Sequence, residues 1–158
     1  MYQRIIVPVD GSQTSNQALA TALGLARESG GRVRLIHVVE EMAYLTGYDQ
    51  FGGYAGDLFK IMRETGTGIL ANGVATAREA GVPAEEVLYD KLGERLPEVV
   101  ADEARRWNAD LIVVGTHGRR GVGRILMGSG AEQILRLAPV PVLVIRSTQP
   151  EPAEDGAA

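Results

Sequence analysis

The chain has 158 residues, no cysteine, two histidines and a formal net charge of −4. This length predicts a single domain with its own core, and the 45% hydrophobic and 23% charged shares are those of a globular protein. The composition excludes disulfides, thiolate metal sites, cysteine nucleophiles and multi-histidine metal sites, and the negative charge argues against nucleic acid as a partner. The apolar run before Asp10 is too short for a signal peptide, so we expect a cytoplasmic protein that does not contact membranes.

Strand-like and helical patterns alternate along the first half of the chain. Residues 4–9 predict a strand, 15–29 a helix, 32–39 a second strand, 40–56 a loop, and 57–80 a long helix. The first helix has a stop signal at Gly30 and Gly31. Gly66 and Gly68 each cost about 1 kcal/mol relative to alanine in a helix. We therefore expect that the long helix can break at these two glycines.

The second half of the chain continues the alternation. Residues 86–89 predict a weaker strand, 94–108 a helix, 111–114 a strand buried on both faces, 129–137 a helix, and 140–145 the last strand. A loop rich in glycine and arginine lies between residues 115 and 127. Five strands alternating with four helices predict an α/β three-layer sandwich with a parallel sheet, because parallel neighbours need crossover connections. We expect residues 1–147 to form this domain and residues 148–158 to be a disordered tail.

Asp10 follows the first predicted strand directly, at the edge of the sheet where parallel α/β folds bind ligands. Two interpretations remain open at this point: Asp10 caps the following turn, or it contacts a ligand. A phosphoryl-accepting aspartate is disfavoured, since a phosphatase of that kind needs a second acid where the chain has Ser12.

The loop after residues 111–114 combines glycines with arginines and precedes a helix. Glycines allow a close approach of the backbone to a ligand, and the start of the next helix attracts anions. These features favour a phosphate cradle, although a surface loop that is basic by chance is the alternative. Neither the P-loop pattern nor the dinucleotide pattern GxGxxG fits, because Ser129 follows Gly128 and Leu126 follows Gly123 at the third position.

The remaining spacing is Gly115, two residues, Gly118, nine residues, Gly128 and Ser129. With the segments 5–12 and 138–146, this spacing resembles the nucleotide-binding members of the universal stress protein family over nearly the whole chain. The resemblance implies a five-stranded sheet of order 3-2-1-4-5, a dimer, and ATP held at the carboxyl ends of strands 1 and 4.

The resemblance also implies a set of binding residues. Pro8, Val9 and Asp10 would lie along the adenine and ribose, with Val38 or Val39 beside the base. The ribose and phosphates would contact Gly115, His117, Gly118, Gly128, Ser129 and Gly130. The chain departs from many relatives at Ala131, where they carry a second hydroxyl residue, and Arg119, Arg120 and Arg124 would compensate. A divalent ion, Mg²⁺ or Mn²⁺, would accompany the nucleotide.

The resulting expectation is an ATP-binding stress-response regulatory protein with at most slow ATP hydrolysis. No local carboxylate is placed to orient His117 as a base, and His37 lies in an apolar strand, where a hydrogen-bonded core role is favoured. Two alternatives remain: a metal-dependent nucleotide hydrolase that uses Asp10 or His117, and a dimeric interaction module that has lost nucleotide binding. We expect a homodimer through the last strand, which lies at a sheet edge in the order 3-2-1-4-5.

Overall fold

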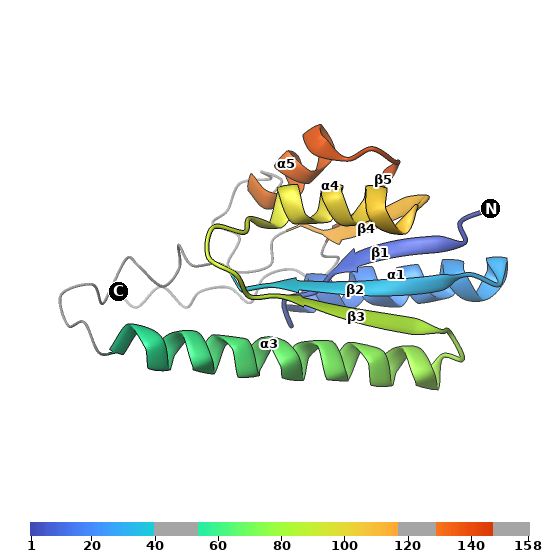
Figure 1. Ribbon diagram of the computed structural model, residues 1–158. Helices are drawn as coiled ribbons and strands as arrows, with labels where there is room; N and C mark the ends of the chain where they lie inside the picture. The colour runs from blue at the N-terminus through green and yellow to red at the C-terminus, as the bar shows by residue number, and fades with distance from the viewer. Residues whose placement is uncertain (40–53, 117–128, 147–158) are drawn as a thin grey trace, which may run out of the picture.

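The computed structural model describes residues 1–39, 54–116 and 129–146. Its elements are β1 (Arg4–Pro8), α1 (Gln13–Ser29), β2 (Arg32–Val38), α3 (Tyr54–Glu79), β3 (Ala84–Tyr89), α4 (Leu96–Trp107), β4 (Leu111–Gly115), α5 (Ser129–Leu137) and β5 (Val142–Ile145). The five strands form one parallel sheet of order β3-β2-β1-β4-β5 (Figure 1). This confirms the predicted α/β class and strand order.

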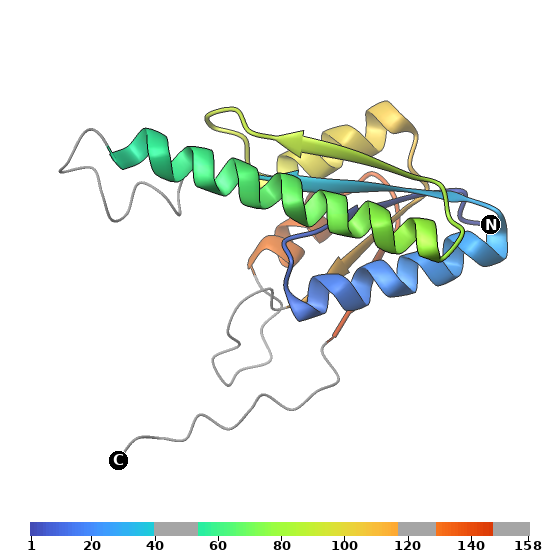
Figure 2. The same ribbon diagram turned by 90° about the horizontal axis from the view of Figure 1, so that it is seen from below.

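The helices cover both faces of the sheet. Helices α1 and α3 lie on one face, and α4 and α5 lie on the other (Figures 1 and 2). Strand β1 divides its side chains between the two layers, because successive residues of a strand point to opposite faces. Ile5 and Val7 pack in the core beneath α1 and α3, whereas Ile6 packs beneath α4 and α5. All three of these apolar side chains are therefore buried.

Several element boundaries differ from the predicted ones. Helix α3 begins at Tyr54, inside the predicted 40–56 loop, and α4 begins at Leu96 rather than at residue 94. A cap or a proline decides two other boundaries. Helix α1 begins at Gln13, two residues earlier than predicted, because the Ser12 hydroxyl caps it by accepting a hydrogen bond from the Ser15 N–H at 3.2 Å. Gly30 ends this helix with a φ of 69°. Strand β5 begins at Val142, after Pro141, rather than at residue 140.

Helix α3 runs without interruption through Gly66 and Gly68, so the break we considered there is absent. Gly66 faces the sheet, where a Cβ atom would come within 2.5 Å of the His37 ring. Gly73 lies similarly close to Leu35, with 2.6 Å from a built Cβ to the leucine Cδ1. These two glycines let the helix approach the sheet closely. The N-terminal turns of α3 extend beyond the carboxyl ends of β2 and β3 (Figure 1).

A buried carboxylate joins β2, β3 and α4. Glu103 of α4 is only 5% exposed, and it pairs with Arg34 of β2 while accepting a hydrogen bond from the Tyr89 hydroxyl of β3. Arg106 lies 3.3 Å from the same carboxylate, and the Arg34 guanidinium stacks over the Trp107 ring at 4.6 Å. Burial, together with the hydrogen bond to Glu103, raises the pKa of Tyr89 to about 12.

This raised pKa makes a pH-dependent contribution to stability. Unfolded Tyr89 ionises near pH 10, so its contribution is complete below that pH and is lost as the pH rises towards about 12. We expect Tyr89→Phe to lower the free energy of unfolding by about 1 kcal/mol at pH 8. The difference from the parent should shrink between pH 10 and pH 12, as measured by urea denaturation. Tyr2→Phe, outside this cluster, is the control, and a difference that does not vary with pH contradicts the prediction.

Candidate functional site

The sheet opens between β1 and β4 at their carboxyl ends. Pairing of β1 with β2 extends to Pro8 and Ile36, and the Val9 N–H still donates to the Ile36 carbonyl at 2.9 Å. Pairing of β1 with β4 ends at Ile6 and Ile112. Backbone groups of a central strand alternate between its two neighbours, so Pro8 faces β4, and it has no N–H to donate. The two strands therefore separate at the point where the strand order reverses, which is the usual ligand position in such sheets.

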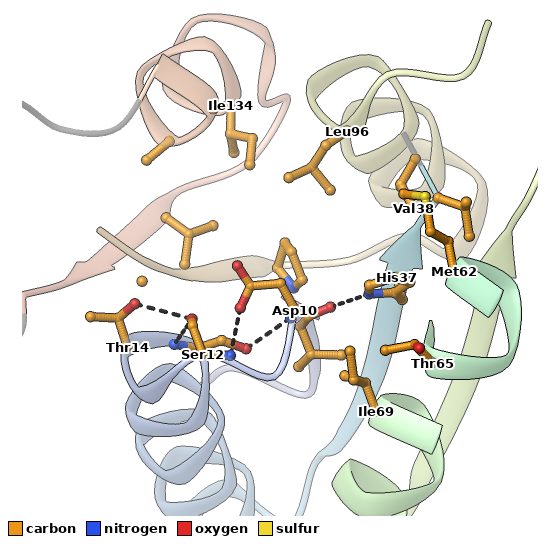
Figure 3. Close-up of a pocket in the computed structure, with 18 of the residues that line it drawn as sticks. Asp10, Ser12, Thr14, His37, Val38, Met62, Thr65, Ile69, Leu96 and Ile134 are labelled. Atoms are coloured by element: carbon orange, nitrogen blue, oxygen red, sulfur yellow. Dashed lines mark hydrogen bonds between the residues drawn. The ribbon is translucent and has the colours of Figure 1, made fainter. Parts of the chain in front are cut away.

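A cavity of about 620 Å³ occupies this opening. The ends of β1, β2 and β4 line it from the sheet, and residues of α1, α3, α4 and α5 complete its walls. Apolar side chains lie on both sides of it: Ile134 lies on the side of Thr14, whereas Thr65 and His37 lie near Met62 (Figure 3). Val38 and Met62 lie on one side with Leu96 near them, whereas the hydroxyl groups of Ser12 and Thr14 lie on the opposite side of Asp10.

Asp10 stabilises the turn and also lines the cavity. Its Oδ1 accepts a hydrogen bond from the Ser12 N–H at 2.9 Å, so it holds the turn that follows β1. Its carboxylate also faces the cavity (Figure 3). The cap of α1 is supplied by Ser12 and not by Asp10. Among the described residues that line the cavity, Asp10 is the one acidic or basic side chain other than His37.

Gly115 ends β4 at the side of the cavity where the hydroxyl groups lie. A Cβ atom at this position would come within 2.6 Å of the Thr14 carbonyl oxygen. The glycine is therefore required for packing of β4 against the first turn of α1, independently of any ligand. Gly130, in the first turn of α5, also lines the cavity, but a Cβ atom there would meet nothing within 4 Å.

His37 forms a hydrogen bond between its Nδ1 and the Val9 carbonyl oxygen at 2.7 Å. The hydrogen-bonded role expected for this histidine is confirmed. It is only half-buried, however, and its ring also lines the cavity beside Thr65 of α3 (Figure 3).

Sequence reasoning missed the walls supplied by the helices. Leu58, Met62 and Ile69 of α3, with Leu96 of α4 and Ile134 of α5, line the cavity. Each belongs to an apolar helical stripe, and such a stripe indicates a buried face without showing whether it packs on the sheet or on a cavity. The only signal for these walls is the length of α3. Its 26 residues are more than are needed to cover the neighbouring strands of 7 and 6 residues, so the helix extends past the sheet.

Comparison with known proteins shows the family of this chain. Residues 1–146 match the universal stress protein family. The chain belongs to the universal stress protein family. It is 32% identical over 152 residues to a universal stress protein of Methanocaldococcus jannaschii, a match that covers 96% of this chain and 86% of that protein.

Solved structures of the universal stress protein family agree with this fold. A crystal structure of a family member from Burkholderia pseudomallei has a TM-score of 0.74 and 34% identity, covering 92% of this chain and 97% of that one. The universal stress protein of Archaeoglobus fulgidus in complex with dAMP has a TM-score of 0.66 and 26% identity, covering 91% and 98% of the two chains.

The structure brings together most of the residues that the universal stress protein resemblance implied. Pro8, Val9, Asp10, Val38, Val39, Gly115 and Gly130 all line the cavity. His117, Gly118, Arg119 and Gly128 lie outside the described residues, as do Arg120 and Arg124. Ser129 begins α5, but its side chain also lies outside the described part. Within residues 1–39, 54–116 and 129–146 there is no group of three or more His, Asp or Glu side chains that could hold a metal ion. None of the helices described there is long and apolar enough to span a membrane.

Proposed function

We propose that this chain binds an adenine nucleotide in the cavity between β1 and β4. The observation that carries the proposal is the cavity itself, whose volume of about 620 Å³ lies within the range of small-molecule sites. Its position at the reversal of strand order is the second support. The complex of the related Archaeoglobus fulgidus protein with dAMP favours an adenine nucleotide over other ligands of this size.

One side of the cavity suits a nucleobase. Val38 and Met62 approach it from β2 and α3, and Leu96 approaches it from α4 (Figure 3). A flat base buried between such side chains leaves water, which is favourable. Asp10, between this side and the hydroxyl groups of the cavity, is placed to accept hydrogen bonds from sugar hydroxyls.

The opposite side suits the phosphates. Gly130 and Ala131 bring the first turn of α5 to the cavity, and the free N–H groups and dipole of a helix N-terminus favour anions. The Thr14 hydroxyl lies on the same side as that of Ser12. For ATP we further propose contacts with Gly115, His117, Gly118, Arg119, Gly128 and Ser129. These contacts rest on the family resemblance.

We propose that the nucleotide is ATP and that the protein is a cytoplasmic stress-response regulator with at most slow hydrolysis. Asp10 offers the cavity's one carboxylate in the described residues, and its Oδ1 already accepts the Ser12 N–H. Among the described lining residues, Asp10 as the one carboxylate is too few ligands for a resident metal. A Mg²⁺ or Mn²⁺ ion would therefore arrive with the nucleotide, where it would neutralise phosphate charge.

The first prediction from this proposal concerns bound nucleotide and its displacement. The parent, purified and heat-denatured, should release adenine nucleotide on anion-exchange chromatography. Gly130→Val should abolish this release, because Gly130 lines the cavity, a Cβ atom there meets nothing within 4 Å, and we expect the added side chain to occupy space that the nucleotide needs. The matched control is Gly24→Val in α1, where a Cβ atom also meets nothing within 4 Å. Equal ATP affinity in the parent and Gly130→Val by titration calorimetry means that the nucleotide binds elsewhere.

The second prediction separates a binding protein from the metal-dependent hydrolase that is its rival. We expect ATP turnover far below about 1 s⁻¹, the low end of typical enzymes, with and without Mg²⁺ or Mn²⁺. The measurement is phosphate release against metal-free controls. Repeated turnover that requires the metal, and that Asp10→Asn abolishes, would establish the hydrolase instead. A parent that binds no nucleotide at all would favour the interaction module.

We also propose a homodimer through β5. The Pro141 carbonyl accepts a hydrogen bond from Ile112 of β4, and the Ile145 carbonyl accepts one from Thr116, which directly follows β4. By alternation, the backbone groups of Val142 and Val144 point away from the sheet. Pairing this edge with a second copy about a two-fold axis satisfies both backbones and closes the assembly.

The test of this dimer uses a β5 side chain that is exposed and does not pack in the core. Val142 and Val144 pack against the core beneath α4 and α5, whereas Leu143 is 36% exposed. We expect Leu143→Lys to convert a dimer to a monomer in sedimentation velocity, because like charges meet across the paired strands. Ile61→Lys is the control, since Ile61 is 57% exposed on α3 at the other side of the sheet. A parent that sediments as a monomer at micromolar concentration contradicts the proposal.

A further inference from the structure

Side chains hold both polar groups of the peptide bond between Val9 and Asp10. The Val9 carbonyl accepts a hydrogen bond from His37 Nδ1 of β2 at 2.7 Å. The Asp10 N–H donates to Ser15 Oγ of α1 at 3.1 Å. A carbonyl can only accept, so the His37 Nδ1 carries the proton.

This arrangement lies where the sheet no longer fixes the chain. Pairing of β1 with β4 has already ended at Ile6, and the last ladder contact with β2 is the Val9 N–H. Beyond that contact, the orientation of the next peptide plane is set by His37 and Ser15. Ser15 is only 5% exposed, so it has little freedom to move. The His37 ring is confined as well, because it lies against Gly66 of α3, where even a Cβ atom would come within 2.5 Å.

We propose that His37 and Ser15 are positioning residues for Asp10 and set the affinity of the cavity for hydroxyl-bearing ligands such as nucleotides. The peptide plane fixes the Asp10 Cα, and the hydrogen bond from the Ser12 N–H at 2.9 Å fixes the carboxylate. Together these contacts point the carboxylate into the cavity (Figure 3). The inference rests on the proposed nucleotide binding and adds two residues, on β2 and α1, that act through a third.

Two substitutions of His37, matched to each other in shape, test the hydrogen bond. Asn and Leu have similar branched side chains, but only Asn keeps an N–H donor near the position of Nδ1. We expect His37→Leu to weaken AMP binding about fivefold, as the loss of one ordinary hydrogen bond does. His37→Asn should retain most of the parent affinity. Titration calorimetry with AMP is the measurement, and thermal melts confirm that both variants fold.

Coupling to Asp10 distinguishes positioning from a general structural role. In an Asp10→Ala background there is no carboxylate to orient, so His37→Leu should then change AMP affinity by less than about twofold. Ser15→Ala should show the same pattern, weakening binding in the parent but not in Asp10→Ala. Ser29→Ala is the matched control, since this serine in the same helix donates to the Tyr2 carbonyl at 2.6 Å, at the other end of the molecule. It should lower stability without changing affinity.

Each outcome bears on one claim. If the parent binds AMP and the loss from His37→Leu keeps its full size in Asp10→Ala, nucleotide binding stands and the positioning role is wrong. The same conclusion follows if His37→Asn binds as weakly as His37→Leu. If the parent binds neither AMP nor ATP, the proposed function is wrong and the inference falls with it.

Discussion

The separation of β1 from β4 is the constraint on which the cavity depends. A continuous parallel ladder would bring the two strands to about 5 Å along their whole length and leave no room between them. Pro8 prevents this, because it faces β4 without an N–H while β2 stays paired on the other side. The proline thus opens only one side of β1. The opening coincides with the reversal of strand order at β1.

The two helical layers then supply walls of different origin. Helix α3 comes from the face that also carries α1, and α4 and α5 come from the other face. A ligand between β1 and β4 is therefore enclosed from both layers, with apolar contacts such as Met62 from one and Leu96 from the other. The floor is different in kind. Asp10, Ser12 and Ser15 lie within six residues of one another and are joined by hydrogen bonds of the turn that follows β1.

This contrast explains what the sequence could and could not predict. The apolar runs and helical periods identify every strand and helix, and Asp10 directly after a buried run marks the floor of the site. The strand order and the roles of residues such as Val38 came from the family resemblance. Leu96 and Ile134 look like ordinary core residues, since periodicity carries no information about what a stripe faces. The sequence predicts only a possible break at Gly66, and it does not show the contact with His37, because the two residues lie 29 positions apart in the chain.

The distant charged cluster contributes to the same walls. Glu103 ties α4 to Arg34 of β2 and to Tyr89 of β3, and removing one partner of a buried ion pair is strongly destabilising. Because α4 is a rigid element, this attachment also fixes its first turn, where Leu96 meets the cavity. Val38 is the last residue of β2, the strand that also contains Arg34. The ion pair and hydrogen bond of Glu103 thus help to position Leu96 and Val38 in the apolar wall, whereas the floor is positioned by the turn that follows β1.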